Sequence, residues 1–113
     1  MISTDSFIKM ALSFPETDEH KHFDKKAYRV KKKIFATLDE KTKRVVLKLS
    51  PMDQSVFCAF DKEIIYPIPN KWGKQGWTFV ELKKVKKEML KDALTTAYIS
   101  VAPPKLGDPY RQI

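Results

Sequence analysis

The 113-residue sequence has few of the residues from which many well-known sites are built. It contains one cysteine, so no disulfide can form within the chain, and three glycines, too few for a glycine-rich phosphate loop. No apolar run approaches the roughly 18 residues of a membrane-spanning helix, and the first residues lack the basic region of a signal peptide. We therefore expect a cytoplasmic protein with no disulfide framework and no membrane partner.

The sequence also has little of what catalysis or metal binding requires. Its lone thiol, Cys58, lies among apolar neighbours, which indicates a buried and inert side chain, and neither histidine has a nucleophile beside it in a recognisable motif. His20 and His22 would share one side of an extended strand, but a zinc site usually needs three or four ligands. We predict a protein that is not an enzyme and has no metal and no cofactor. We interpret residues 18–24 as a solvated, charged approach to the first strand.

Positive charge is what the sequence has in excess. The net charge is +8 at pH 7, and it gathers in two segments: residues 21–48 carry +8 and residues 70–91 carry +5, while the rest of the chain is neutral or acidic. Such an asymmetry indicates a polyanionic partner. The alternative is that lysine simply keeps a small domain soluble.

Periodicity and turn residues predict the helices and strands. An apolar stripe at helical spacing predicts a first helix from Ser3 or Thr4 to about Phe14, closed by Pro15. Alternation and turn signals then predict the remaining elements. In order, these are strands over 23–30, 34–38 and 45–49, a helix over 51–61, an edge strand over 64–69, a turn over 70–76, a strand over 77–82, a helix ended by Pro103-Pro104, and an extended tail from about 105.

The order of these elements, α-β-β-β-α-β-β-α, predicts the fold class. Three consecutive strands joined by short turns make a meander, and two more strands extend the sheet after the second helix. We predict one α+β domain over residues 1–113, a two-layer sandwich with one antiparallel sheet of about five strands and helices on one face.

Four stretches of the sequence resemble one family. The segment from Phe23 to Ala36 (FDKKAYRVKKKIFA) is similar to the first hairpin of the MmcQ/YjbR family of small bacterial proteins, and VLKLSP at 46–51 to its strand-to-helix junction. The segment WGKQGWTFVEL at 72–82 resembles the strand that precedes the final helix in this family. The segment from Ala97 to Lys105 resembles the C-terminal segment that is usual in the family. The resemblance runs from about residue 5 to residue 106. The sequence departs from the family at one place, where it has Lys83-Lys84-Val85 and similar proteins often have an acidic or small capping residue. The resemblance therefore does not define the first residue of the last helix.

The resemblance implies a fold grouped with secretion-chaperone-like folds and a proposed DNA-binding mode in which two β-hairpins act as paired wings. Lysines on hairpin tips can follow a phosphate backbone, whereas base readout favours arginine, of which the chain has three. We predict weak, sequence-tolerant binding of DNA or another polyanion. The candidate residues are Lys41, Lys43 and Arg44 at the tip of the first wing, Lys31, Lys32 and Lys33 at the turn before it, and Lys71, Trp72 and Lys74 on the second wing.

Other interpretations stay open. Trp72 and Trp77 would also suit a core position beside a turn that glycine permits. The edge strand at 64–69 and the open face of the sheet would suit a peptide or a second copy of the chain, so a peptide-binding or dimerising adaptor is the main alternative function. A catalytic cleft assembled from distant residues, such as Tyr28, His22 and Tyr66, is a further alternative.

Overall fold

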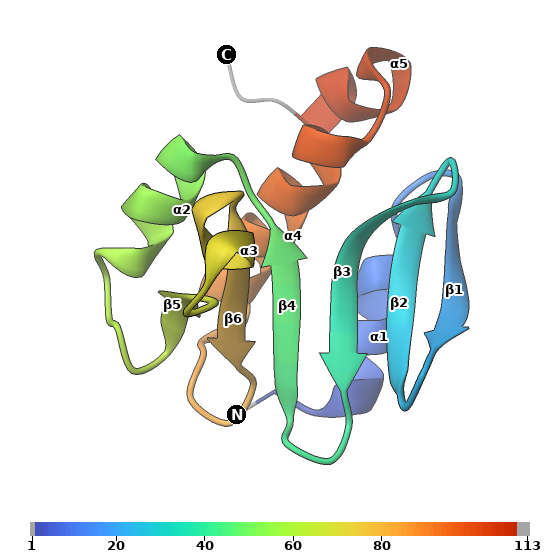
Figure 1. The fold of residues 1–113 in the computed structure, drawn as a ribbon. Helices are drawn as coiled ribbons and strands as arrows, with labels where there is room; N and C mark the ends of the chain where they lie inside the picture. The colour runs from blue at the N-terminus through green and yellow to red at the C-terminus, as the bar shows by residue number, and fades with distance from the viewer. Residues whose placement is uncertain (1, 111–113) are drawn as a thin grey trace.

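The computed structural model describes residues 2–110. They form a six-stranded antiparallel sheet in the order β1-β2-β3-β4-β6-β5, with α1 and α4 packed on one face (Figure 1). The elements are α1 (Thr4–Leu12), β1 (Thr17–His22), β2 (Lys25–Val30), β3 (Lys33–Asp39), β4 (Arg44–Lys48), α2 (Pro51–Cys58), β5 (Ile65–Pro67), α3 (Lys71–Lys74), β6 (Trp77–Glu81), α4 (Lys87–Val101), α5 (Pro104–Gly107) and the 3-10 turn η1 (Asp108–Tyr110). The predicted α+β class and antiparallel sheet are confirmed, with six strands instead of about five.

The additional strand is β1, in the segment predicted to be a solvated approach. All six of its residues pair with β2, from Thr17 opposite Val30 to His22 opposite Lys25. Alternation of polar and apolar residues did not reveal this strand, because none of its side chains is apolar and five of the six are exposed. Charged side chains are common on an edge strand, where they discourage pairing with other chains.

Local signals at the helix starts explain two of the helices. The Ser3 hydroxyl accepts a hydrogen bond from the Ser6 N–H at 3.1 Å at the start of α1, and the Ser50 hydroxyl accepts one from the Asp53 N–H at 3.1 Å at the start of α2. Helix α2 ends at Cys58, three residues before the predicted end. Helix α4 has Lys86 as its N-cap without a side-chain hydrogen bond, so its start depends on packing instead of capping.

The core lies between the sheet and helices α1 and α4. The ring of Tyr98 on α4 stacks on Phe14 with centroids 4.6 Å apart and meets Phe35 of β3 edge-on at 5.6 Å. The Tyr98 hydroxyl donates a hydrogen bond to the Pro15 carbonyl at 2.7 Å. Through these contacts, the segment just after α1 and helix α4 pack together on β3.

The prediction of an extended tail from about 105 is wrong for the described residues. Helix α4 ends at Val101, as the prolines predicted, but Pro104 then begins the short helix α5. Burial of an aromatic ring explains the turn back toward the core, because the Tyr110 ring packs on Phe14 at 5.4 Å and on Tyr98 at 5.7 Å. Residues 111–113 of the predicted tail lie outside the described residues.

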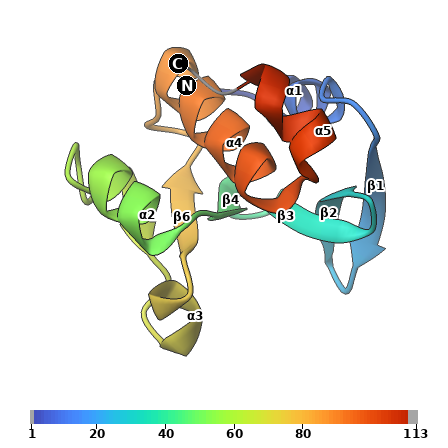
Figure 2. The same cartoon turned by 90° about the horizontal axis from the view of Figure 1, so that it is seen from above.

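Helices do not all lie on one side of the sheet. Figure 2 shows α1 and α4 on one side of the sheet and α3 on the side away from α4. Helix α2 lies beside the edge strand β5. The face opposite α4 is therefore largely uncovered, and we call it the open face. Within residues 2–110, no helix has the length and hydrophobicity of a membrane-spanning segment.

Candidate functional site

The sheet topology divides the predicted wing residues between two ends of the sheet. Consecutive turns of an antiparallel meander lie at opposite ends. The turn at 31–32 lies at the same end as α3 and the end of β4, where Lys48 pairs with Trp77, whereas the turn at 40–43 lies at the other end, where Arg44 pairs with Glu81 (Figure 1). We call these the α3 end and the opposite end. Lys41, Lys43 and Arg44 are therefore separated from the other predicted residues by the length of the strands.

The α3 end carries six lysines, which we call the α3-end lysines. They come from the turn between β2 and β3 and the first residue of β3, from the last residue of β4, and from helix α3. They are Lys31, Lys32, Lys33, Lys48, Lys71 and Lys74. Sequence reasoning missed Lys48, although its place in the alternation of Arg44, Val46 and Lys48 on β4 put it on the open face.

The tight turn at the α3 end has an unusual composition. Lys31 and Lys32 form a two-residue hairpin loop with φ angles of 51° and 69°. Both angles lie in the left-handed region, which two-residue hairpins normally fill with Asn and Gly, because a side chain there is strained. Lysine occupies both positions against this preference. The Lys31 ammonium lies 3.6 Å from a Glu16 carboxylate oxygen.

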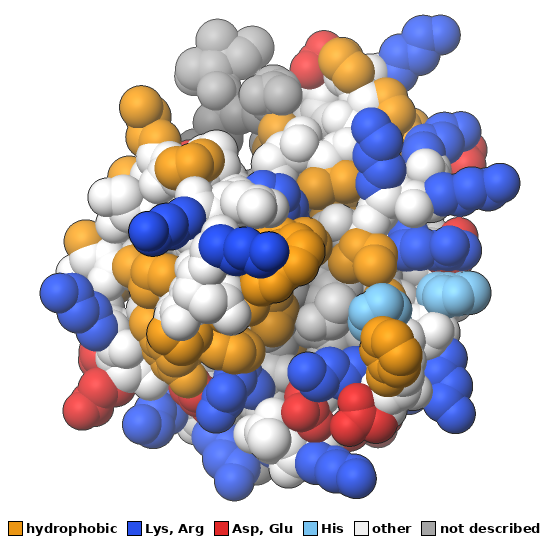
Figure 3. All heavy atoms as spheres, viewed as in Figure 1, with side chains coloured by type: hydrophobic (Ala, Val, Ile, Leu, Met, Phe, Trp, Pro, Cys, Tyr) orange, Lys and Arg blue, Asp and Glu red, His pale blue; other side chains and the backbone are white. Residues whose placement is uncertain are grey.

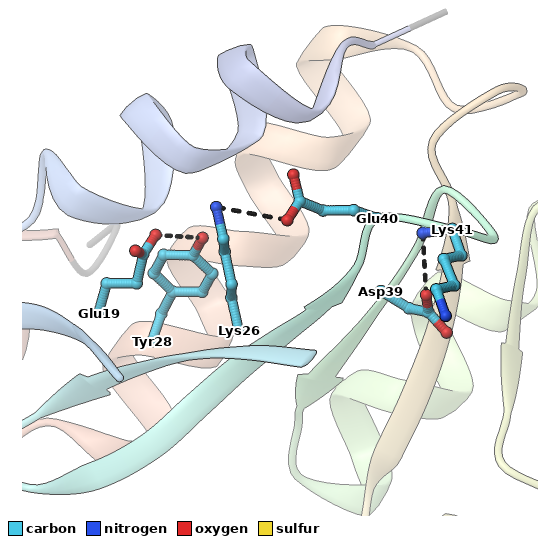
Figure 4. A network of polar contacts seen from close by, with 6 residues as sticks. All are labelled: Glu19, Lys26, Tyr28, Asp39, Glu40 and Lys41. Carbon is cyan, nitrogen blue, oxygen red and sulfur yellow. Dashed lines mark hydrogen bonds and ion pairs between the residues drawn. The ribbon is translucent and has the colours of Figure 1, made fainter. Parts of the chain in front are cut away.

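Carboxylates lie among the cations at the opposite end. Asp39 accepts hydrogen bonds from the backbone N–H groups of Lys41 at 3.0 Å and Thr42 at 3.3 Å, and Glu40 forms an ion pair with Lys26 at 3.3 Å (Figure 4). Partial burial raises the pKa of Asp39, but the hydrogen bonds from Thr42 and Lys41 outweigh it and lower that pKa below its ordinary value. The carboxylate is therefore charged at neutral pH and offsets nearby positive charge.

Arg44 is occupied by contacts within the protein. Its Nε atom lies 3.1 Å from Glu81, and its guanidinium lies over the Phe79 ring, 4.6 Å from the centroid. The ion-pair distance is short, but Nε is buried and makes no aligned hydrogen bond. Glu81 also accepts a hydrogen bond from the Tyr66 hydroxyl, and the pKa of Tyr66 is raised by burial and by that bond. If Arg44 turned away to bind a phosphate, the partly buried Glu81 carboxylate would lose its ion-pair partner.

Aromatic side chains occupy the open face between the two ends. Phe79 lies opposite both Val46 and Tyr66, and Trp77, two residues before it, is on the same face of β6. The Lys48 ammonium lies over the Trp77 ring, 5.8 Å from its centroid. In Figure 3, hydrophobic side chains fill the middle of this face over β4, β6 and α3, with Lys and Arg side chains around them. The sequence could have revealed this aromatic group, because the alternation of residues along β6 places Trp77, Phe79 and Glu81 on the same face of the strand.

Helix α3 holds Trp72 on the edge of this surface. Trp72 is 49% exposed, and its backbone N–H donates a hydrogen bond to the Asn70 side-chain oxygen at 2.8 Å. Trp77 is partly buried, so neither tryptophan has the fully buried position that the alternative interpretation allowed. Predicted as a turn, residues 70–76 contain one turn of helix.

The described residues show no arrangement for a metal. His20 and His22 both lie on β1, so the alternation of a strand places them on the same side, as predicted. Within residues 2–110, no group of three or more His, Cys, Asp or Glu side chains is placed to hold a metal ion. Cys58 is largely buried at the end of α2, and burial raises the pKa of its thiol.

Fold and surface together define a class: a small antiparallel α+β domain with one face covered by helices and the other left open, aromatic and rimmed by lysine. The YjbR family model matches residues 12–99, so the chain belongs to the MmcQ/YjbR family. A crystal structure of protein DR2400 from Deinococcus radiodurans, with the family designation DUF419, has a similar fold. The TM-score is 0.77 at 22% identity, over 88% of this chain and 78% of that one. No curated protein matches the chain.

Proposed function

We propose that this protein binds nucleic acid, or a polyanion of similar charge, weakly and without sequence selectivity at the α3 end of its sheet. The observation that carries the proposal is that the α3-end lysines, which come from separate segments of the chain, lie at one end of the sheet. Of these six lysines, only Lys31 forms an ion pair with a carboxylate within residues 2–110. Lysines without a carboxylate partner can follow a phosphate backbone and release its counterions.

The proposed site is narrower than the two wings predicted from the sequence. It keeps the lysines at 31–33 with Lys71, Trp72 and Lys74, and it adds Lys48. It leaves out Lys41, whose backbone N–H donates to Asp39, and Lys43, which lies in the same turn at the opposite end, and it leaves out Arg44, which is paired with Glu81. Because arginine is absent from the site, bidentate recognition of guanine has no donor there, which supports tolerance of sequence.

Strain at the turn supports the same proposal. Lys31 and Lys32 occupy left-handed backbone positions that cost roughly 1 kcal/mol each for a residue with a side chain. Asn and Gly would fill this turn without that cost. A preference for positive charge at the turn would account for lysine at both positions, although Lys43, outside the site, has the same backbone conformation.

Fluorescence anisotropy with labelled DNA over a salt series tests the proposal. About four phosphate contacts give a slope of log affinity against log salt of roughly −3.6. We expect the combined variant Lys31→Glu, Lys71→Glu and Lys74→Glu to lower the affinity at least tenfold and to flatten that slope. The matched control, Lys41→Glu, Lys43→Glu and Lys83→Glu, changes the net charge equally at the opposite end. Equal losses in the two variants would show that only net charge matters, and the site would then be wrong.

A second function, protein interaction, is favoured by one specific surface. Met52, Val56 and Phe60 on and just after α2 are 78%, 57% and 67% exposed, and Val56 and Phe60 line a surface depression. An apolar stripe on an exposed helix suits a peptide or a second copy of the chain. The edge strand β5, predicted for this role, spans only three residues and ends in Pro67, which favours α2 over it. Light scattering over a concentration series tests dimerisation, which Val56→Asp should abolish.

A further inference from the structure

We propose that the polymer bound at the open face is a single-stranded nucleic acid, with a base stacked on the indole of Trp72 and the backbone held by the α3-end lysines. This inference rests on the proposed function and specifies its ligand. It is carried by the way in which the protein positions an exposed aromatic ring next to unpaired cations.

Buried contacts hold the segment that carries Trp72 against the sheet. The side-chain amide of Gln54, which is largely buried, donates to the Gly73 carbonyl at 2.8 Å and lies 3.1 Å from the Thr78 hydroxyl. The backbone at Gly73 is so close to Ile68 that an added Cβ would lie 1.8 Å from the Ile68 carbonyl oxygen. The backbone beside Trp72 is therefore fixed.

A second close approach fixes the other side of the turn. Gly76 has a φ of 104°, and a Cβ there would lie 1.7 Å from the Leu49 carbonyl oxygen. The Leu49 N–H also donates to the Gly76 carbonyl at 3.0 Å. Trp72 stays about half exposed on this backbone, and a backbone that is already held in place loses little entropy when the ring stacks on a base.

Cations and aromatic rings alternate on this surface. The ammonium of Lys71 lies 5.9 Å from the centroid of the Trp72 ring, and that of Lys48 lies 5.8 Å from the centroid of Trp77. The Lys48 ammonium also donates a hydrogen bond to the Gln75 carbonyl, whereas Lys71 can leave its ring for a phosphate while a base takes its place on the ring. Phe79 is a poorer platform, because the guanidinium of Arg44 covers it and is itself paired with Glu81.

Stacking of this kind selects single strands over duplexes. Every base has a π-face, so an aromatic platform tolerates any sequence, but in a duplex those faces are already stacked on neighbouring base pairs. A duplex offers this surface only its phosphates. Since the site holds lysines and no free arginine, preference for a single strand comes from the rings and not from hydrogen bonds to base edges.

The test compares the affinity of the protein for three ligands, each labelled or used as a competitor. They are a thymidine oligonucleotide of about 15 nucleotides, a duplex of equal length, and heparin, which is a polyanion without bases. We expect Trp72→Ala to lower affinity for the single strand about tenfold, as loss of one base stack does. Affinity for heparin should stay within twofold, and Trp72→Tyr should restore most of the single-strand binding. Phe60→Ala, which removes another exposed aromatic ring, is the control and should change neither.

Intrinsic fluorescence gives a second readout, because the chain has two tryptophans. We expect the thymidine oligonucleotide to quench Trp77→Phe, which keeps Trp72, more strongly than Trp72→Phe. Equal affinities for single strand and duplex that Trp72→Ala leaves unchanged would overturn this inference and leave the proposed function standing. An absence of binding to all three ligands would overturn both.

Discussion

The Gln54 side chain and the Gly73 backbone are joined by a hydrogen bond of 2.8 Å that ties helix α2 to α3. The same amide nitrogen lies 3.3 Å from the Trp77 carbonyl, so one side chain serves acceptors on both sides of the turn. The stability of the α3 end and the position of Trp72 therefore depend on a residue outside the surface itself.

Gln54→Ala should destabilise the protein by about 1–3 kcal/mol, because buried carbonyl groups lose their donor. Urea unfolding at neutral pH measures this change. Gln75→Ala serves as the matched control, since its side chain is exposed at the end of the same turn, and it should change stability by less than about 0.5 kcal/mol. Equal stability of the two variants would mean that the turn is held by its backbone contacts alone.

Exchanging the turn at 31–32 should separate stability from binding. The double variant Lys31→Asn and Lys32→Gly relieves left-handed strain at both positions, and we expect it to raise the free energy of unfolding by about 1 kcal/mol. The same variant removes two cations and should weaken polyanion binding. Chemical unfolding and a DNA titration, run on one preparation, check both parts. A variant that is more stable and binds equally well would remove this turn from the site.

Alkaline unfolding should depend on Tyr28. Its side chain is buried and its hydroxyl donates to Glu19 at 2.8 Å, and burial followed by that bond raises the pKa of Tyr28 above its ordinary value (Figure 4). Because the folded state favours the neutral phenol, the stability linked to this group is complete below the ordinary tyrosine pKa of about 10. It is lost as the pH rises further, by up to about 1.4 kcal/mol per pH unit.

Urea unfolding between pH 8 and pH 11 measures this dependence. Tyr28→Phe should be less stable at pH 8, since it lacks the bond to Glu19, but its stability should fall less steeply above pH 10. Burial also raises the pKa of Tyr98, so part of the alkaline loss should persist in the variant. A slope that Tyr28→Phe leaves unchanged would place the alkaline sensitivity elsewhere.

The sequence predicted most of the elements because their patterns are strong. Ser50 and Pro51 marked the start of α2, and the prolines at 103 and 104 marked the end of α4. It did not reveal β1, whose fully polar strand pairs through its backbone, or the helical tail, which is set by packing of Tyr110 on distant rings. Both failures come from interactions that leave no local periodic pattern.

The candidate site divides in the same way. Sequence by itself determined the charge, the fold class and the presence of lysine on successive turns. Only the tertiary structure decided which turns share an end of the sheet. Antiparallel pairing sends successive turns to opposite ends, so Lys31 lies at the same end as Lys71, and Lys41 lies at the other. Backbone hydrogen bonding sets that arrangement, and the charges of the side chains have no part in it.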